Sequence, residues 1–229
     1  MIALIGAMEE EIKEYLFHAE NIQEEHWHDT VFYHADLCGK KVLIVRSGIG
    51  KVLAAMVCQH VIDTYKPEKV IFTGVAGALD KSFDIGDVVV SDDLIQHDVN
   101  GEALGFSRGT ILFSNEKEFK ACEELKALAL STPMVEHRMH EGRILTGDQF
   151  FTHKELTANA YLTEELAGHA IEMEGAAIAQ VCVRNKIPFL VIRTISDKAD
   201  SDAAEDFAKL LPIIAKNSYA ISEHMLKNM

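Results

Sequence analysis

Hydrophobic positions along the chain follow two patterns. Short runs rich in β-branched residues predict strands, and longer segments with apolar residues at helical spacing predict helices. The predicted strands cover residues 1–5, 31–37, 41–46, 69–73, 87–91, 143–146 and 189–194, and the predicted helices cover residues 51–65, 116–130, 174–185 and 203–226. Continuously apolar runs, such as residues 70–72 and 88–90, are typical of strands covered by helices on both faces. The pattern therefore predicts an α/β fold with a sheet between two helical layers.

Proline and glycine positions divide the chain into elements rather than domains. Pro67 and Pro188 each lie where a predicted helix gives way to a predicted strand. Pro212 lies inside the last predicted helix, so we expect that helix to be kinked or split there. Residues 100–115 are polar and contain glycine, which is typical of a surface loop or of a flap over a site. No linker or repeat interrupts the sequence, so we expect one domain over residues 1–229.

The composition limits the classes of partner. The chain has 229 residues, of which 48% are apolar, and this is enough for a core without a disulfide or metal. Its formal net charge of −14 is unfavourable for binding nucleic acid or an anionic membrane, because both need a basic surface. The apolar N-terminus, residues 1–8, is too short for a signal peptide or a membrane span. Widely spaced cysteines without a CxxC pair predict buried free thiols in a cytoplasmic protein: Cys38, Cys58, Cys122 and Cys182.

Four segments follow predicted strands and carry glycine or acidic residues: 6–11, 47–51, 73–77 and 196–197. Ligands of open α/β sheets bind beyond the carboxyl ends of strands, so these segments are the first candidates for a site. The 47–51 segment is not a P-loop, because Val45 and Val52 replace the required Gly and Ser/Thr. It is not a dinucleotide motif either, because Leu53 replaces the third glycine. Gly48 and Gly50 alone are typical of a tight turn between strand and helix.

Three consecutive acids, Glu9, Glu10 and Glu11, fall in the first turn of an expected helix. The helix dipole favours negative charge there. A carboxylate held beside a strand end is also a candidate general base that takes a proton from water. The residue types alone do not distinguish the three.

Two further acidic positions suggest chemistry. Glu172 and Glu174 flank Met173 at the start of an expected helix. A carboxylate accepts hydrogen bonds from both hydroxyls of a diol, so Glu174 suits a ribose, although charge at a helix start explains it equally well. Asp197 follows a strongly apolar strand, with Ser196 beside it. Burial would keep this carboxyl neutral and able to act as an acid, and an Asx turn or helix cap is the alternative.

Aromatic and histidine residues give weaker evidence for a functional site. Phe150 and Phe151 follow a Gly-Asp-Gln sequence and fit either stacking on a flat heterocycle or an aromatic core. We expect no metal or other cofactor, because two histidine pairs lack a third ligand at motif spacing: His26 with His28, and His137 with His140.

Six segments considered together are far more specific than any one of them. They are residues 6–11, 47–51, 73–77, 147–150, 172–176 and 193–197, and they span nearly the whole chain. In order and spacing they resemble the bacterial 5′-methylthioadenosine/S-adenosylhomocysteine nucleosidases, which belong to the purine nucleoside phosphorylase superfamily. The resemblance implies a nucleoside-phosphorylase-like three-layer sandwich with a mixed central β-sheet flanked by helices.

The resemblance also implies an activity, namely hydrolysis of the N-glycosidic bond of 5′-methylthioadenosine and S-adenosylhomocysteine with release of adenine. Candidate further substrates are 5′-deoxyadenosine and 6-amino-6-deoxyfutalosine. By resemblance, Glu11 activates water, Asp197 protonates N7 of adenine, and Arg193 helps to hold the water and the acidic groups. Glu174 takes the ribose hydroxyls, and Phe150 stacks on adenine. The implied substrate-binding residues are Met8, Ile49, Ala76, Gly77, Phe150, Phe151, Glu172, Met173, Glu174 and Ser196.

Two positions depart from the family's pattern. Val75 stands where many relatives carry a serine close to the attacking water, and Asn100 stands where an acidic residue often follows the His-Asp pair. The resemblance further implies a homodimer in which the second subunit helps to close the 5′ end of the site. The segment after Leu104, which belongs to this region, is shorter than in many relatives.

Two other functions compete with hydrolysis. A purine nucleoside phosphorylase uses phosphate in place of water, but the acids at residues 9–11 would repel phosphate where it needs an arginine. A non-catalytic nucleoside-binding module needs no acid and base together. The joint presence of Glu11, Glu174, Arg193 and Asp197 therefore argues against it.

Overall fold

A computed structural model describes residues 1–134, 136–151, 155, 158–197 and 203–229. Its strands are β1 (Ile2–Gly6), β2 (Glu20–Trp27), β3 (Thr30–Leu37), β4 (Lys40–Arg46), β5 (Lys69–Ala78), β6 (Val88–Gln96), β7 (Phe119–Lys120), β8 (Met139–Thr146), β9 (Ala170–Glu172) and β10 (Phe189–Asp197). Its helices are α1 (Glu9–His18), α2 (Lys51–Tyr65), the 3-10 helix η1 (Glu102–Leu104), α3 (Glu123–Leu130), α5 (Tyr161–Glu164), α6 (Gly175–Asn185) and α7 (Ala203–Asn228).

The strands form one mixed sheet that closes partly on itself. β10 pairs in parallel with β5 and antiparallel with β6. β8 joins β6 and β9 in parallel, and β9 returns to β5 antiparallel. These five strands therefore make a closed ring of pairings. From β5 the sheet continues outward through β1 and β4 to the antiparallel β3 and β2. The expected mixed sheet is confirmed.

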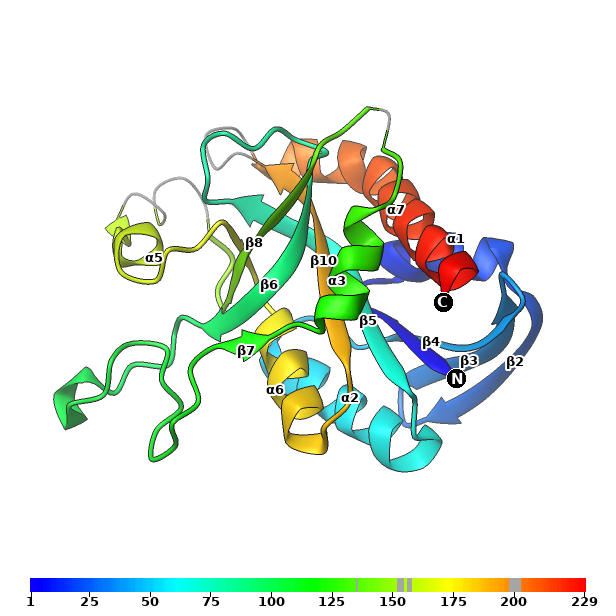
Figure 1. Ribbon diagram of the computed structural model, residues 1–229, viewed down its shortest axis with the longest axis horizontal. Coiled ribbons are helices and arrows are strands. Elements are labelled where there is room, and N and C mark those ends of the chain that lie inside the picture. The colour runs from blue at the N-terminus through cyan, green and yellow to red at the C-terminus, as the bar shows by residue number, and fades with distance from the viewer. Residues whose placement is uncertain (135, 152–154, 156–157, 198–202) are drawn as a thin grey trace.

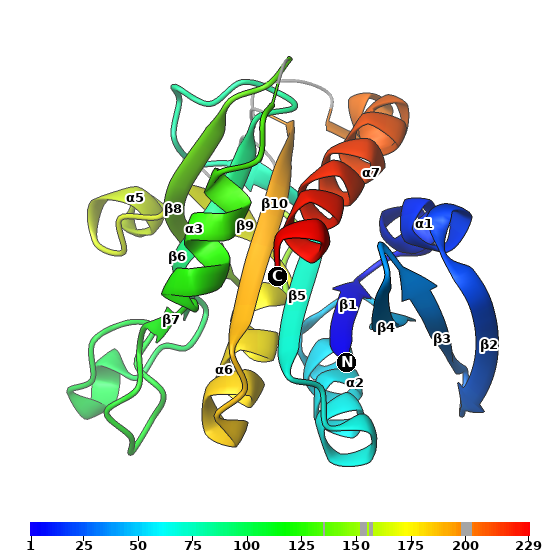
Figure 2. The same ribbon diagram turned by 45° about the vertical axis from the view of Figure 1, so that its right-hand side comes forward.

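Helices cover the sheet on two sides, as Figures 1 and 2 show. α7 packs on β10 and β5, α1 packs on β1 and β4, and α3 lies beside α7. On the other side, α6 packs on β6, β8 and β10, and α2 packs on α6. The expected three-layer sandwich is confirmed. The central strands β1, β5, β6 and β10 are almost wholly buried, because their β-branched and aliphatic side chains face helices on both sides.

Several local predictions are wrong. Residues 116–122 are not helical, because β7 pairs with β6 there and α3 begins only at Glu123. Of the two outcomes expected at Pro212, the split is wrong, because α7 is continuous over Ala203–Asn228, whereas the kink stays a prediction. β2 was not expected, because its sequence consists mostly of polar and charged residues. All of its residues except the last are exposed. It forms because its backbone pairs with β3, and Trp27 at its end stacks on His60 with ring centroids 3.9 Å apart.

The four cysteines are free thiols, of which Cys58 and Cys182 are fully buried and Cys38 and Cys122 only partly. The expectation that all four are buried is therefore wrong for Cys38 and Cys122. Within the described part of the chain, no helix combines the length and apolar character needed to cross a membrane.

Candidate active site

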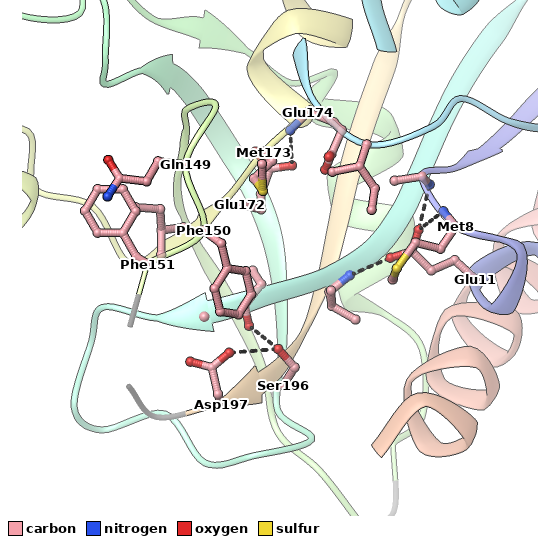
Figure 3. Close-up of a pocket in the computed structure, with 16 residues that line it drawn as sticks. Met8, Glu11, Gln149, Phe150, Phe151, Glu172, Met173, Glu174, Ser196 and Asp197 are labelled. Carbon is pink, nitrogen blue, oxygen red and sulfur yellow. Dashed lines mark hydrogen bonds between the residues drawn. The ribbon is translucent and has the colours of Figure 1, made fainter. Parts of the chain in front are cut away.

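A cavity of about 280 Å³ lies where the carboxyl ends of β1, β5 and β10 meet the loops after β4 and β8. Figure 3 shows Glu11 with Met8 on one side of it, Glu174 with Met173 on another, and Asp197 with Ser196 and Phe150 on a third. Its lining consists of Ala7, Met8, Glu11, Ile49, Val75, Ala76, Gly77, Gln149, Phe150, Phe151, Ile171, Glu172, Met173, Glu174, Ser196 and Asp197. Among the predicted site residues, Arg193 alone is absent from this lining.

The structure separates the three acids at the start of α1. Glu9 and Glu10 are exposed, whereas Glu11 is 3% exposed and faces the cavity. Glu11 Oε2 accepts hydrogen bonds from the backbone N–H groups of Ala7, at 2.6 Å, and Met8, at 2.9 Å. Its Oε1 accepts one from Val75 at 3.2 Å. Glu11 is thus the only one of the three acids placed to act on a molecule in the cavity.

Glu11 occupies a tight polar notch in the sheet. Burial raises the pKa of its carboxyl, and the nearby charge of Arg193 and the three backbone N–H groups oppose that rise. A Cβ atom on Gly74 would lie 2.5 Å from Glu11 Oε1 and 3.0 Å from Arg193 Nη1. Glycine at position 74 therefore lets the carboxylate and the guanidinium approach each other over the strand.

Arg193 lies behind the cavity wall on β10 and is 1% exposed. Its Nη2 donates a 2.7 Å hydrogen bond to Glu172 Oε2. Its guanidinium carbon lies 4.0 Å from the centre of the Phe72 ring, which is a cation–π contact. The Arg193 Nε atom is buried and has no hydrogen-bond partner among the residues that the structure describes. Arg193 is therefore placed to hold the acidic residues in position.

Glu172 clamps the start of α6. Its Oε2 accepts hydrogen bonds from the backbone N–H groups of Glu174, at 3.1 Å, and Gly175, at 2.7 Å, besides that from Arg193. Its Oε1 accepts one from the hydroxyl of Thr146. Glu172 lines the cavity, but both of its carboxyl oxygens bind other groups of the protein. The sequence predicted it as a substrate contact, and the structure gives it hydrogen bonds that position the start of α6.

Glu174 is the N-cap residue of α6 and is 6% exposed. Its Oε1 accepts a 2.8 Å hydrogen bond from the backbone N–H of Gly50, in the turn that follows β4. Burial, followed by the charge of Glu172, raises the pKa of Glu174 to about 8, against the opposing effects of Arg193 and the Gly50 N–H. The Glu174 side chain is therefore oriented before any ligand arrives.

Asp197 ends β10 at a β-bulge. The β10–β5 register is irregular between Ile195 and Asp197, and such an extra residue re-aims the side chains around it. Asp197 is 6% exposed, and its Oδ2 accepts a 3.0 Å hydrogen bond from the Ser196 hydroxyl. A Cβ atom on Gly77 would lie 3.2 Å from Asp197 Oδ1, so Gly77 makes room for the carboxyl.

The two phenylalanines have different environments. Phe150 is 57% exposed at the cavity, where its ring is available to a flat ligand (Figure 3). Phe151 is 8% exposed and belongs to a small apolar cluster with Ile95, Leu145 and Leu162. The sequence left open whether these rings stack on a flat heterocycle or belong to the core. Phe150 is placed for stacking, and the Phe151 side chain belongs to the core.

Four lining residues were not among the predicted site residues: Ala7, Val75, Gln149 and Ile171. Ala7, Val75 and Gln149 lie within the glycine-containing segments noted in the sequence, and Ile171 gave no signal. Residues 100–115 contribute nothing to the lining of this chain's cavity. Within the described ranges, no three His, Cys, Asp or Glu side chains are grouped as a metal site would require.

Comparison with known proteins gives a consistent result. The family model of the phosphorylase superfamily matches residues 1–227. A 5′-methylthioadenosine/S-adenosylhomocysteine nucleosidase of Tolumonas auensis is 38% identical, with 100% of this chain and 99% of the relative covered.

Two solved structures are also similar over the full length. The nucleosidase of the same name from Neisseria meningitidis, in complex with methylthio-immucillin-A, has a TM-score of 0.93 at 33% identity and covers 100% of this chain and 99% of its own. The futalosine hydrolase of Helicobacter pylori has a TM-score of 0.90 at 34% identity, covering 100% and 97%. The chain belongs to the phosphorylase superfamily and, within it, to the 5′-methylthioadenosine/S-adenosylhomocysteine nucleosidase family.

Proposed function

We propose that the chain hydrolyses the N-glycosidic bond of 5′-methylthioadenosine and S-adenosylhomocysteine and releases adenine. The observation that carries this proposal is the placement of two buried carboxyl groups, Glu11 and Asp197, on different sides of one cavity. A reaction that protonates a leaving base and activates water needs an acid and a base separated in this way, as in inverting glycosidases.

In the proposed mechanism, Asp197 donates a proton to N7 of adenine and so weakens the bond to C1′. Glu11 takes a proton from water, which attacks C1′ as positive charge develops on the ribose. Glu174 accepts hydrogen bonds from the ribose hydroxyls, and Phe150 stacks on the base. Arg193 and Glu172 act as positioning residues behind this set, since their side chains contact each other and the start of α6.

The lining of the cavity favours water over phosphate as the nucleophile. None of the described lining residues is Lys or Arg, and three are Glu. A phosphate dianion beside Glu11 would meet a carboxylate, and the nearby Arg193 is 1% exposed behind the cavity wall and already paired with Glu172, which disfavours the phosphorylase alternative. A non-catalytic binding module is disfavoured because it requires no buried acid and base.

The proposal also covers the substituent at the 5′ position of the substrate. Met8, Met173 and Ile49 contribute apolar side chains to the cavity, which suits a methylthio group. The similarity to futalosine hydrolase keeps 6-amino-6-deoxyfutalosine as a second candidate substrate.

We also propose that the chain acts as a homodimer of single-domain subunits in the cytoplasm. Large apolar side chains are exposed on α2 and on the projecting segment between β6 and β7, which supports a covered surface: Val52, Leu53, Met56, Leu104 and Phe113. One sheet running through the chain supports a single domain. Four free cysteines support a reducing compartment.

The test is adenine release from 5′-methylthioadenosine, S-adenosylhomocysteine and 6-amino-6-deoxyfutalosine, each with and without added phosphate. Release that is independent of phosphate and yields free 5-methylthioribose from the first substrate supports the proposal. Release that requires phosphate and yields a ribose 1-phosphate product would establish a phosphorylase and remove the role given to Glu11. Absence of release from all three would leave a binding module.

A further inference from the structure

Three charged residues from distant parts of the sequence close a ring of contacts beside the cavity. Lys51 begins α2, Asp98 follows β6, and Asp148 follows β8. Lys51 Nζ donates a 2.7 Å hydrogen bond to Asp98 Oδ1. The backbone N–H of Asp148 donates to Asp98 Oδ2 at 3.1 Å, and the backbone N–H of Lys51 donates to Asp148 Oδ1 at 2.8 Å.

Each contact joins a different pair of loops, so the ring fixes three loops against one another. The Lys51 side chain is only 17% exposed, and those of Asp98 and Asp148 are 32% and 48% exposed. Because the ammonium group is largely withdrawn from water, its ion pair is screened less than one on an open surface.

The residues next to Lys51 and Asp148 connect this ring to the cavity. Gly50, which precedes Lys51, donates its N–H to Glu174. Gln149 and Phe150, which follow Asp148, line the cavity (Figure 3). A Cβ atom on Gly50 would lie 3.2 Å from Asp148 Oδ1, so the loops after β4 and β8 are in close contact. The two successive N–H groups of Gly50 and Lys51 thus donate to two different carboxylates, that of Glu174 in the cavity lining and that of Asp148 next to the lining residue Gln149.

We propose that Lys51, Asp98 and Asp148 form a latch that positions the Gln149–Phe150 wall of the cavity relative to Glu174. This inference rests on the proposed function, since it assigns that wall to the purine base. The latch residues touch neither the substrate nor the reacting atoms. They act through the backbone of residues 147–151. Each member takes part in two of the contacts, and the Lys51 ammonium group, which bonds Asp98 and lies 3.9 Å from Asp148 Oδ2, is the one cationic group among them.

The experiment compares Lys51→Met with wild type. Methionine keeps an unbranched side chain, one atom shorter than that of lysine, and removes the charge. We expect KM for 5′-methylthioadenosine and Kd for free adenine to rise together, by roughly 3- to 10-fold, while kcat changes less. We also expect hydrogen exchange of the peptide covering residues 147–151 to become faster. Lys51→Arg should restore all three values to near wild type.

The matched control is Lys69→Met. Lys69 is 23% exposed and makes a 3.0 Å ion pair with Glu124 at the opposite end of the strands. The Lys69→Met variant should leave KM, adenine affinity and hydrogen exchange of residues 147–151 unchanged. Raising the salt concentration to 1 M should increase KM of the wild type more than that of Lys51→Met, because screening weakens an ion pair that the variant lacks.

The outcomes separate the latch from the proposed function. If Lys51→Met lowers the melting temperature but leaves KM, adenine affinity and the exchange of residues 147–151 at wild-type values, the latch is overturned and Lys51 is merely structural. If wild type cleaves no nucleoside, the proposed function fails. In that case the exchange of residues 147–151 in Lys51→Met and Lys69→Met still decides whether the latch orders the loop.

Discussion

The backbone N–H of Gly50 donates a 2.8 Å hydrogen bond to Glu174 Oε1, although the two residues are 124 positions apart. This contact engages one of the two carboxyl oxygens of a side chain that lines the cavity, and it holds that side chain in one orientation. A group that is already oriented loses little freedom when it binds a ligand. The arrangement therefore bears directly on how the ribose is recognised.

Replacing Glu174 with alanine should weaken binding of ribosides far more than binding of free adenine. Two hydrogen bonds to the Glu174 carboxyl, which a pKa of about 8 keeps largely protonated near neutral pH, contribute about 2 kcal/mol together, which corresponds to roughly 30-fold in Kd. The measurement is Kd for free adenine and for a non-hydrolysable riboside by calorimetry. Equal losses for the two ligands would contradict the assignment of Glu174 to the ribose.

Replacing Glu11 with glutamine should lower turnover by roughly 100- to 10,000-fold, because the amide cannot take a proton from water. The control is Glu10→Gln, which makes the same change one residue earlier in the same helix, on a side chain exposed to solvent. Single-turnover rates of adenine release for the two variants measure the difference. Similar rates in both variants would mean that Glu11 is not the base.

Replacing Asp197 with asparagine should abolish most turnover while nucleoside binding stays within a few-fold of wild type. Asparagine has the same shape but carries no acidic proton for N7. Turnover and Kd for 5′-methylthioadenosine are measured on the same preparation. Full activity in Asp197→Asn would remove this residue from the acid role, and loss of binding would assign it to the recognition of the base.

Replacing Gly74 with alanine should reduce turnover by more than about tenfold, because the new methyl group would meet Glu11 Oε1 at 2.5 Å and force the carboxylate to move. The effect should fall on kcat, since the purine and ribose contacts lie elsewhere in the cavity. Steady-state kinetics, with a thermal melt to verify folding, test this. Wild-type kcat would show that the position of Glu11 is not critical.

The Glu174 carboxyl should make stability fall as pH rises from about 5 to 8, and His97, whose pKa burial lowers to about 4, offsets this fall below about pH 6.5. Glu174 has a pKa of about 8 in the folded protein, against an ordinary value of 4.5, so its carboxyl binds one more proton in the folded state than in the unfolded state over this range. Each pH unit then costs up to about 1.4 kcal/mol of unfolding free energy, and Glu11, whose pKa is also raised, adds a change of the same sign. Glu174→Gln should make the profile flatter between these pH values in denaturant titrations. An unchanged slope in that variant would show that Glu174 does not hold this proton.

The sheet was predictable because its central strands are apolar on both faces. Such strands contain consecutive apolar residues, for example Val88, Val89 and Val90. β2 was not, because its side chains are mostly exposed and its pairing depends on β3 rather than on burial. The helical pattern at residues 116–122 was misleading, because pairing of β7 with β6 outweighs local periodicity. Pro212 did not split α7.

The candidate site was predictable as a set of segments but not as a set of contacts. Three adjacent acids look alike in sequence, and only the orientation of α1 turns Glu11 inward while Glu9 and Glu10 face solvent. The engagement of Glu172 depends on Thr146 and Arg193, which lie on other strands, so it follows from the tertiary fold. The roles assigned to Glu11, Asp197 and Glu174 stay predictions until the variants above are measured.

The last strand of the chain, β10, lies between β5 and β6, which are made much earlier. During synthesis, the ribosome therefore carries a chain whose two central strands have unpaired edges until residues 189–197 emerge. Such edges promote association between nascent chains, and they need protection by chaperones or by rapid completion of translation. Asp197 is the final residue of that same strand. The chain thus acquires its proposed acid group in the same step that removes its open edges.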